Sequence, residues 1–578
     1  MSSILLTILI ASLVLIYLSL PYLKNNLTDV DILALLNQSS ISHTRKLGET
    51  AIYRSIDVPH GLPLSTGLRI RSGYNLRDGN LKDIWYNCII DLKESTNSNN
   101  NNKRINFIKD KDSINLLKLN KLCHSLENSI NNSTNFKKFT LISPLNSINS
   151  IIVLFTSLFM NSNFTLNYIP SNEFNLNNLS LNDSDLIFTI SENIPILLRH
   201  LESLNKIIVL DEISDKFLKN SNKIIKFSDF VNSIDDDASD NDLKYDYNPN
   251  DIKIENNPLI ISTNKSITKF YQRNFVSAIS SQLMSLPKDH NWNSSDNLLI
   301  SINDQEITEN KENNIEPEIS NFIIKLLSGL LSNINEITIS LDSELNFNKL
   351  IEYNITILSM NSFNFKKLIK NKLILNNLPK LSKISKNLIT NEIFNNFGKL
   401  SEFKSLNLRL IYLSINNNLN YNFENSINSN ELITILSILS TRIIIEKLNK
   451  FCIGAIFKTN LFDYRLHKSD LKLLNSPSSS SSSNLFYRKL GVASNCIESK
   501  LKDCNLNGVE LLAENKSGKL FIRGFNIGKS DLNINTFKRT EAQGKSGEAA
   551  GEDEGWMPTE IYGKFGNDGC FYEYAISE

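Results

Sequence analysis

Residues 555–569 read GWMPTEIYGKFGNDG, and this glycine-punctuated block closes the 578-residue chain. Short β-branched runs between turn residues also occur just upstream, in GVELLAE (508–514) and GKLFIRG (518–524). Such runs are typical of short strands joined by tight turns. We therefore expect a small β-rich subdomain over residues 485–578, preceded by a Ser-rich linker over residues 476–484.

Between residues 139 and 475, short β-branched runs alternate with longer amphipathic ones. Alternation of this kind predicts βαβ units on a mostly parallel sheet. The chain is therefore predicted to be an α/β protein with two stacked α/β subdomains in this region. The expected strands are 139–143, 165–169, 185–190, 206–211, 258–262, 298–302, 336–340, 354–360, 408–414 and 451–457, and the expected helices lie near 147–160, 193–204, 270–286, 316–331 and 431–449.

The first 24 residues contain an apolar run from Ile4 to Leu20 that carries no charge and is followed by Lys24. About 20 apolar residues span the hydrocarbon core of a bilayer. A cleaved signal peptide is the alternative, but no basic segment precedes the run and no small-residue cleavage site follows it. We expect a retained transmembrane anchor over residues 1–24, with Lys24 favouring a body that faces the cytoplasm.

Residues 25–138 are expected to form a lead-in with a helix near 29–38 and an Asn-rich surface insertion at 97–102.

The composition argues against several classes of function. Lys and Arg number 61 and Asp and Glu also number 61, so no net field favours nucleic acid. The cysteines and histidines are dispersed without metal-ligand spacing, which argues against a zinc site, a disulfide framework and a Cys/His nucleophile.

The closing block follows the register G-W-x-x-T-G-D-[IL]-G-x-x-x-x-D-G of a known family at Gly555, Trp556, Thr559, Gly563, Asp568 and Gly569. GKLFIRGFNI (518–527) is similar to the family segment G-E-L-x-[VI]-R-G-P, and Gly491 with KLKD (500–503) is similar to its G-x-P…v-k-l-x-D stretch. The chain thus resembles the adenylate-forming, or AMP-binding, superfamily and the N-terminal domain of its ligases. GETAIYRS (48–55) and LRDGNLKDIWYNCI (76–89) suggest the long-chain fatty acyl-CoA synthetase branch.

This resemblance implies activation of a carboxylate with ATP and Mg²⁺ to an acyl-adenylate, followed by transfer to coenzyme A. The family's phosphate loop is rich in glycine, whereas this chain has no glycine between Gly79 and Gly329. The equivalent segment is ISTNKSITK (261–269). Its candidate nucleotide-binding donors are Ser262, Thr263, Lys265, Ser266 and Lys269. The alternative is an ordinary strand-to-helix loop.

Three further elements depart from the family pattern. In the adenine and magnesium motif, Thr459 is kept but Asn460 stands where the family places its Mg²⁺-binding glutamate, and a neutral amide does not offset a dication's charge. In the ribose-binding motif, Thr559 is followed by Glu560, which is the candidate substitute for the family's aspartate. The sequence ends at Glu578, so we expect the C-terminal domain and its catalytic lysine to be absent.

These departures predict a membrane-anchored acyl-CoA synthetase-like protein with impaired catalysis that acts by binding lipid or protein; no catalytic residue is assigned. One alternative is a divergent, active fatty acid–CoA ligase that completes its site with a partner subunit and uses ATP and Mg²⁺. Another is a membrane-anchored α/β interaction protein of unrelated origin. The expected partners are an endoplasmic reticulum or lipid-droplet membrane, a long-chain fatty acid or acyl-CoA, and a protein.

Overall fold

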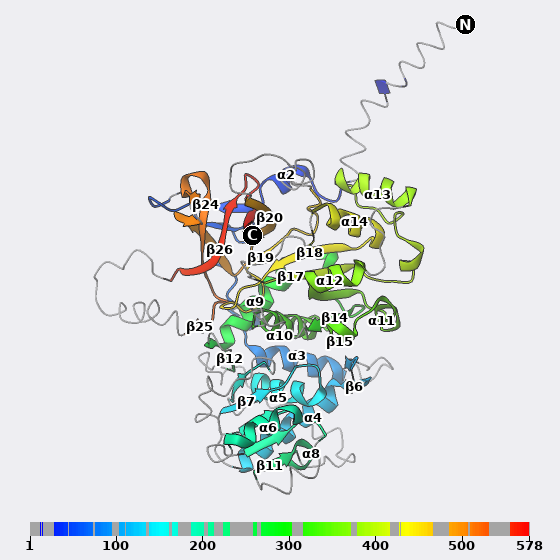
Figure 1. Cartoon of the computed structure of the whole chain (residues 1–578), viewed down its shortest axis with the longest axis vertical. Helices are drawn as coiled ribbons and strands as arrows, with labels where there is room; N and C mark the ends of the chain where they lie inside the picture. The colour runs from blue at the N-terminus through cyan, green and yellow to red at the C-terminus, as the bar shows by residue number, and fades with distance from the viewer. Residues whose placement is uncertain are drawn as a thin grey trace.

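Two large sheets organise the computed structural model, one of eight strands and one of 15 strands. Figure 1 places the eight-stranded sheet at the lower end of the molecule and the 15-stranded sheet above it. The structure describes residues 12, 14–15, 28–43, 45–72, 75–94, 103–109, 111–133, 138–160, 164–170, 186–200, 206–212, 223–231, 258–262, 267–302, 316–370, 379–416, 427, 429–465, 485–506, 509–530 and 555–576.

The eight-stranded sheet has the order β11-β10-β9-β7-β8-β12-β13-β25. Its pairs are parallel from β11 to β12, and β13 is antiparallel to both of its neighbours. Parallel pairing agrees with the βαβ rhythm of the sequence. The strands are β7 (Lys138–Ile142), β8 (Thr165–Tyr168), β9 (Leu186–Thr189), β10 (Lys206–Val209), β11 (Ile224–Lys226), β12 (Leu259–Ser262), β13 (Ile267–Phe270) and β25 (Lys529–Ser530).

One half of the 15-stranded sheet is built on parallel strands, in the order β6-β5-β15-β14-β16-β17-β18. Only β6, at the edge, is antiparallel to its neighbour in this half. The strands are β5 (Arg104–Phe107), β6 (Asp112–Asn115), β14 (Asn297–Ile302), β15 (Glu336–Leu341), β16 (Ile357–Asn361), β17 (Leu410–Ile415) and β18 (Arg442–Lys447).

The other half of this sheet is antiparallel and continues as β19-β20-β27-β26-β24-β21-β2-β1. The closing block supplies β26 and the turn before β27, while two strands near the N-terminus finish the sheet. The strands are β1 (Ser39–Ile41), β2 (Tyr53–Ser55), β19 (Phe457–Lys458), β20 (Leu485–Ala493), β21 (Ile497–Lys502), β24 (Ser517–Gly524), β26 (Met557–Phe565) and β27 (Phe571–Ile576). Two hairpins stand apart, β3 (Ile70–Ser72) with β4 (Asn75–Arg77) and β22 (Cys504–Leu506) with β23 (Val509–Leu511).

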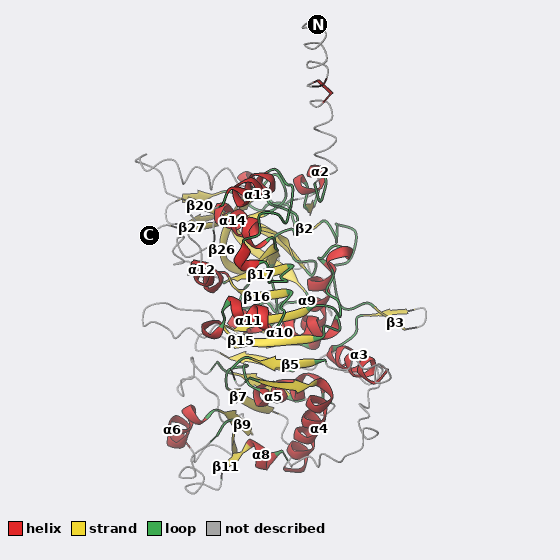
Figure 2. Cartoon of the chain, turned by 90° about the vertical axis from the view of Figure 1, so that its right-hand side faces the viewer, coloured by secondary structure: helices red, strands yellow, loops and turns green. Residues whose placement is uncertain are grey.

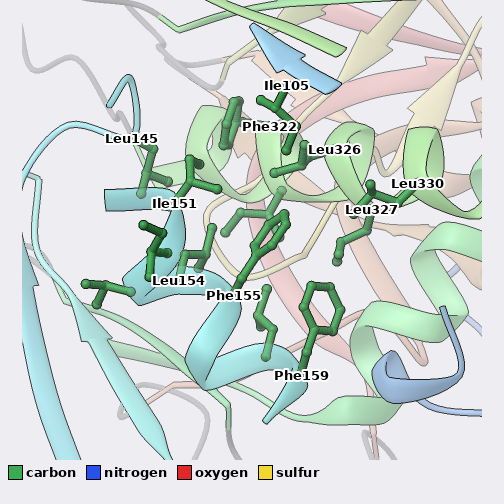
Figure 3. Packing of buried hydrophobic residues seen from close by; sticks show 14 of the residues in the cluster. Ile105, Leu145, Ile151, Leu154, Phe155, Phe159, Phe322, Leu326, Leu327 and Leu330 are labelled. Carbon is green, nitrogen blue, oxygen red and sulfur yellow. The ribbon is translucent and has the colours of Figure 1, made fainter. Parts of the chain in front are cut away.

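Helices cover the sheets, and two of them join the sheets into one core. The helix α5 covers the eight-stranded sheet, and α10 covers the 15-stranded sheet. Figure 3 shows Phe155 and Phe159 of α5 facing Leu326 and Leu327 of α10. The α5 residues 150–159 are all buried, as expected for a helix that is apolar on every side. The helices are α2 (Ile32–Leu36), α3 (Leu81–Glu94), α4 (Leu116–Ser133), α5 (Ile148–Phe159), α6 (Ile194–Leu197), α8 (Phe227–Phe230), α9 (Gln272–Met284), α10 (Glu316–Leu331), α11 (Phe347–Glu352), α12 (Ser362–Lys370), α13 (Lys380–Thr390) and α14 (Ser429–Leu439).

Several expected elements differ from the observed ones. The helix expected over 431–449 ends at Leu439, and residues 442–447 form the parallel strand β18. Ser440 separates the two with a φ of 51°. The buried isoleucines at 443–445 cannot be told from part of a buried helix by periodicity. The strand expected at 451–457 is limited to β19, and the helix expected at 193–204 is the single turn α6 flanked by 3₁₀ turns.

No helix within the described residues is long and apolar enough to cross a membrane. The predicted anchor from Ile4 to Leu20 lies almost entirely outside those residues, of which only 12, 14 and 15 fall in this run.

A fully buried ion pair fastens α10 to β18. Lys325 Nζ donates to Glu446 Oε1 at 2.6 Å, and the same ammonium lies 3.5 Å from the ring centroid of Tyr412. Burial is the main reason that the pKa of Lys325 falls to about 7, because it outweighs the opposing attraction of Glu446. The buried Lys325 side chain therefore gains or loses its proton near neutral pH.

We expect the stability contributed by this pair to depend on pH. Between the folded pKa of about 7 and the ordinary value of 10.5, the unfolded chain holds a proton that the folded chain lacks. Raising the pH from 7 to 9 therefore stabilises the folded chain by about 2 kcal/mol relative to a Lys325→Met/Glu446→Gln variant. Thermal unfolding of both proteins at the two pH values checks this, and parallel pH profiles would contradict it.

Candidate functional site

Segments of both large sheets meet at residues 525–530, which we call the junction segment. On one side, Ile453 N donates to Asn526 O at 3.0 Å and Gly528 N donates to Phe451 O at 2.9 Å. On the other side, Lys529 and Ser530 form β25 and pair with β13. The junction segment thus joins the loop that follows β18 to the hairpin of β12 and β13.

Asn274, at the start of α9, holds the junction segment in place. Its Nδ2 donates to Phe525 O at 2.6 Å and to Ile527 O at 3.0 Å, while its Oδ1 accepts from Tyr271 N at 2.7 Å. The close approach also requires a glycine. A Cβ on Gly528 would lie 2.8 Å from both the Phe270 ring and the Thr268 methyl group.

The phosphate-loop candidates lie on the β12–β13 hairpin. Residues 263–266 connect two antiparallel strands, so the expected strand-to-helix loop is wrong and α9 begins only at Gln272. Ser262, at the carboxyl end of β12, donates to Asn167 Oδ1 at 2.6 Å. Lys269 lies exposed on β13. The remaining candidates, Thr263, Lys265 and Ser266, lie outside the described residues.

Cations gather where this hairpin meets the junction segment. Lys269 and Lys529 are direct cross-strand partners. Lys529 Nζ lies 5.1 Å from the ring centroid of Tyr271, and the Arg273 guanidinium carbon lies 5.8 Å from the same centroid. Like charges placed directly opposite each other destabilise a strand pair, so an anion bound here would relieve the repulsion. We call Lys269, Lys529 and Arg273 the basic cluster.

Sequence reasoning found only one member of the basic cluster. Lys529 lies two residues after the 518–527 stretch that carries the resemblance, and with Ser530 it forms the short strand β25. The glycine and lysine that directly follow the family-like stretch 518–527 were the available signal. Arg273 and Asn274 carried no comparable signal, because their proximity to Lys529 depends on the pairing of β13 with β25.

The candidates of the closing block point in opposite directions. Thr559 is buried and donates through Oγ1 to Leu520 O at 2.8 Å, so its hydroxyl serves the pairing of β24 and β26. The Glu560 side chain is 62% exposed and lies 3.3 Å from Lys450 Nζ. Lys450 directly precedes Phe451, whose carbonyl accepts from the junction segment. Glu560 therefore belongs to the rim of the junction, while Thr559 has a structural place.

The adenine and magnesium candidates are engaged by their own backbone surroundings. Thr459 Oγ1 accepts from Ile445 N at 2.9 Å, beside the β18–β19 pair. Asn460 Oδ1 accepts from Phe462 N at 2.9 Å and so closes a local turn. Within the described part of the chain, no hydrogen bond or ion pair joins one candidate residue to another. The Asn460 side chain offers a neutral amide oxygen that already accepts this hydrogen bond, and it carries no charge to offset that of a dication.

Among the described residues, one group could offer metal-ligating side chains: Asp463, which follows this turn, lies with Asp568 and Cys570. Arg465 and Lys489 both form ion pairs with both aspartates. Burial alone would raise the pKa of each aspartate, but the cations outweigh it and hold both pKa values below the ordinary range. Two cations thus occupy the place that a metal would need, so these residues do not fit a magnesium site.

Polar side chains also meet at the carboxyl edge of the parallel strands, where open α/β sheets bind ligands. Lys447, at the end of β18, donates to Glu573 Oε1 at 2.5 Å, and Arg488 Nη2 donates to Glu573 Oε2 at 3.2 Å. The Nε and Nη1 atoms of Arg488 are buried and have no hydrogen-bond partner in the described part of the chain. A bound carboxylate would satisfy these donors. Sequence reasoning missed Arg488, because a lysine and an arginine in a strand carry no local signal.

Known proteins with this architecture include several ligases. No family model matches the chain. A putative uncharacterized protein of Saccharomyces cerevisiae is 27% identical over 578 residues, covering 95% of this chain and 94% of the yeast protein. The luciferase-like enzyme of the nonluminescent mealworm Zophobas morio is 12% identical with a TM-score of 0.53, covering 89% of this chain and 98% of that enzyme.

Two further structures are a long-chain-fatty-acid-CoA ligase from Archaeoglobus fulgidus and the N-terminal domain of FACL13 from Mycobacterium tuberculosis. The first is 12% identical with a TM-score of 0.52, covering 89% of this chain and 86% of that ligase. The second is 9% identical with a TM-score of 0.51, covering 86% of this chain and 99% of that domain. The chain has the fold of the adenylate-forming ligases. At these identities, the fold is what the proteins share.

The basic cluster predicts protection by a polyphosphate anion. We expect pyrophosphate, without metal, to raise the thermal midpoint of the full chain, and a Lys269→Gln/Lys529→Gln variant to lose most of that rise. A Lys349→Gln variant serves as the control, because Lys349 lies on α11, away from the junction segment. Equal protection of all three proteins would show that the cluster does not hold the anion.

Proposed function

We propose that this chain is a membrane-anchored, acyl-CoA synthetase-like protein that binds an acyl carboxylate or another lipid anion and has lost ordinary adenylation. The fold supports this proposal, since two of the similar structures are an acyl-CoA ligase and a luciferase-like enzyme. The bound lipid would be a long-chain fatty acid or acyl-CoA, and a protein partner would receive or present it.

The observation that carries the proposal is a group of cationic donors, together with the lack of a carboxylate suited to bind magnesium at the expected position. Donors for an anion are present in the basic cluster and at Arg488. The residue at the expected magnesium position, Asn460, has its side-chain oxygen in a local turn, and the nearby aspartates are neutralised by Arg465 and Lys489. Adenylation needs a dication to offset the triphosphate, so binding without that reaction is the function that these residues support.

The basic cluster also favours a second candidate, a divergent fatty acid–CoA ligase that is completed by a partner subunit. Lys269 and Lys529 would hold the phosphates, and Glu560, at the rim of the junction, would reach the ribose. ATP and Mg²⁺ would then be the cofactors. An interaction protein of unrelated origin is the weaker alternative, because the chain contains both α/β sheets of the ligase fold.

The proposed location is an endoplasmic reticulum or lipid-droplet membrane, with the body in the cytoplasm. The apolar run from Ile4 to Leu20 supports the anchor, and Lys24 on its C-terminal side supports this orientation. A membrane would also supply the long-chain ligand by lateral diffusion.

The decisive measurement is fatty-acid-dependent exchange between ATP and pyrophosphate in the presence of Mg²⁺, with the full chain in detergent. We expect no exchange above a control without acid, because Asn460, at the expected magnesium position, offers a neutral amide and no carboxylate. The same preparation should bind a fluorescent long-chain fatty acid. An Arg488→Met variant should bind it at least about tenfold more weakly, because the loss of a charge-assisted hydrogen bond costs about 1.5–3 kcal/mol.

Lys489→Met is the matched control for that variant, because Lys489 is the next residue of β20 and its ion pairs lie with Asp463 and Asp568 instead of Glu573. Its fatty-acid affinity should remain that of the wild type. Exchange above the acid-free control would refute the loss of adenylation and favour the divergent ligase. Unchanged binding by the Arg488→Met protein would remove Arg488 from the lipid site.

A further inference from the structure

The helix α13 has an unusual distribution of side chains. Ser382, Ser385 and Ile389 are buried at spacing i, i+3, i+7. The residue that precedes each of these buried residues is apolar. Leu381 is 61% exposed and Ile384 is 52% exposed, while Leu388 is half-buried. The helix thus buries two serines and exposes two large aliphatic side chains.

The buried serines are held by specific bonds, so the orientation of α13 is fixed. Ser382 Oγ donates to Gly398 O at 2.8 Å, and Ser385 Oγ donates to Asn395 Oδ1 at 2.6 Å. The segment also fits closely, because a Cβ on Gly398 would lie 2.3 Å from Ser385 Cβ. Rotating α13 to bury Leu381 and Ile384 would break these contacts.

The charge of α13 complements an anionic surface. The helix contains Lys380, Lys383 and Lys386 and no acidic residue. A helix with an apolar stripe flanked by lysines is the pattern of segments that lie in the interface of a bilayer, with the apolar side chains among the lipid tails and the lysines near lipid phosphates.

The position of α13 in the fold places this stripe at one end of the molecule. Figures 1 and 2 both show α13 at the same end as α2, and α2 also exposes apolar side chains, with Leu33 72% exposed. An ion pair links the two regions. Asp29 binds Arg442, and the Arg442 guanidinium carbon lies 4.4 Å from the ring centroid of Phe394, four residues after α13.

This linkage connects α13 to the proposed anchor. Asp29 lies nine residues after Leu20, and nine extended residues reach at most about 30 Å. An anchor ending at Leu20 therefore keeps the end of the molecule that bears α2 and α13 within that distance of the bilayer.

We propose that α13 lies on an anionic membrane surface, with Leu381 and Ile384 inserted among the lipids and Lys380 and Lys383 near their phosphates. The inference rests on the membrane anchor proposed above. It adds a second contact that sets the orientation of the body: the α2–α13 end faces the bilayer, and the eight-stranded sheet points away from it (Figure 1).

Tryptophan quenching by lipid tests this orientation in the full chain. The three native tryptophans, Trp85, Trp292 and Trp556, are buried, so a tryptophan placed at Ile384 reports its own surroundings. The Ile384→Trp protein is reconstituted into vesicles of phosphatidylcholine and phosphatidylserine that carry a quencher at a shallow acyl position. Ile196→Trp is the matched control, because Ile196 is 38% exposed on α6 at the other end of the molecule.

We expect the quenching of Ile384→Trp, above the wild-type background, to be at least twice that of Ile196→Trp. A Leu381→Trp protein should behave like Ile384→Trp. Phosphatidylserine should increase the quenching of Ile384→Trp relative to vesicles of phosphatidylcholine alone. Introducing Lys380→Gln and Lys383→Gln into the Ile384→Trp protein should remove most of that increase, since each lysine near an anionic surface strengthens binding several-fold.

Equal quenching of the two positions, or none, would overturn the proposal for α13. Flotation of the vesicles in a density gradient tests the anchor separately. If the protein floats with the vesicles although the quenching is equal or absent, the anchor stands and only this inference fails. Failure to float would overturn the anchor and α13 together, while the fluorescent fatty-acid binding measurement would still decide the lipid-binding proposal. A dimer that an Ile384→Lys variant dissociates would assign the face to a second copy of the chain and also overturn the proposal.

Discussion

The apolar core shared by α3, α5 and α10 is the interaction on which the rest of this structure depends. The helices α5 and α10 cover different sheets, and together they place Phe155, Phe159, Leu326 and Leu327 in one core (Figure 3). Trp85 of α3 stacks on Phe159 at a centroid distance of 4.9 Å and extends the same cluster. Because close-packed interiors do not slide freely, this contact sets the position of one sheet against the other.

That fixed position is what makes the junction segment possible. Residues 525–530 pair with β13 of the eight-stranded sheet and with the loop after β18 of the 15-stranded sheet, so both sheets must be correctly placed at once. The same geometry sets Lys269 against Lys529 and brings Glu560 to Lys450. The charges at this junction are therefore placed by pairings between segments of the two sheets that are distant in the sequence.

Much of the architecture followed from the sequence, and the errors have a common cause. The expected helices at 147–160 and 316–331 match α5 and α10, and most of the expected strands match as well. The stretch 431–449 was misassigned, because residues 443–447 are buried on both faces of the strand and periodicity cannot distinguish such a strand from a buried helix. At the candidate site, the motif pointed to Lys269. Lys529 and Arg273 join it only through the pairing of β13 with β25, and Arg488 meets Glu573 only through the pairing of β20 with β27.

The sequence by itself determined the α/β class, the β-rich closing block and the apolar run near the N-terminus, because each depends on the composition and periodicity of neighbouring residues. Only the tertiary structure decided that Thr559 is buried, that Asn460 closes its own turn, and that α13 buries serines and exposes Leu381 and Ile384. These outcomes depend on which segments, distant in the sequence, pack beside one another, and local propensity does not encode that choice.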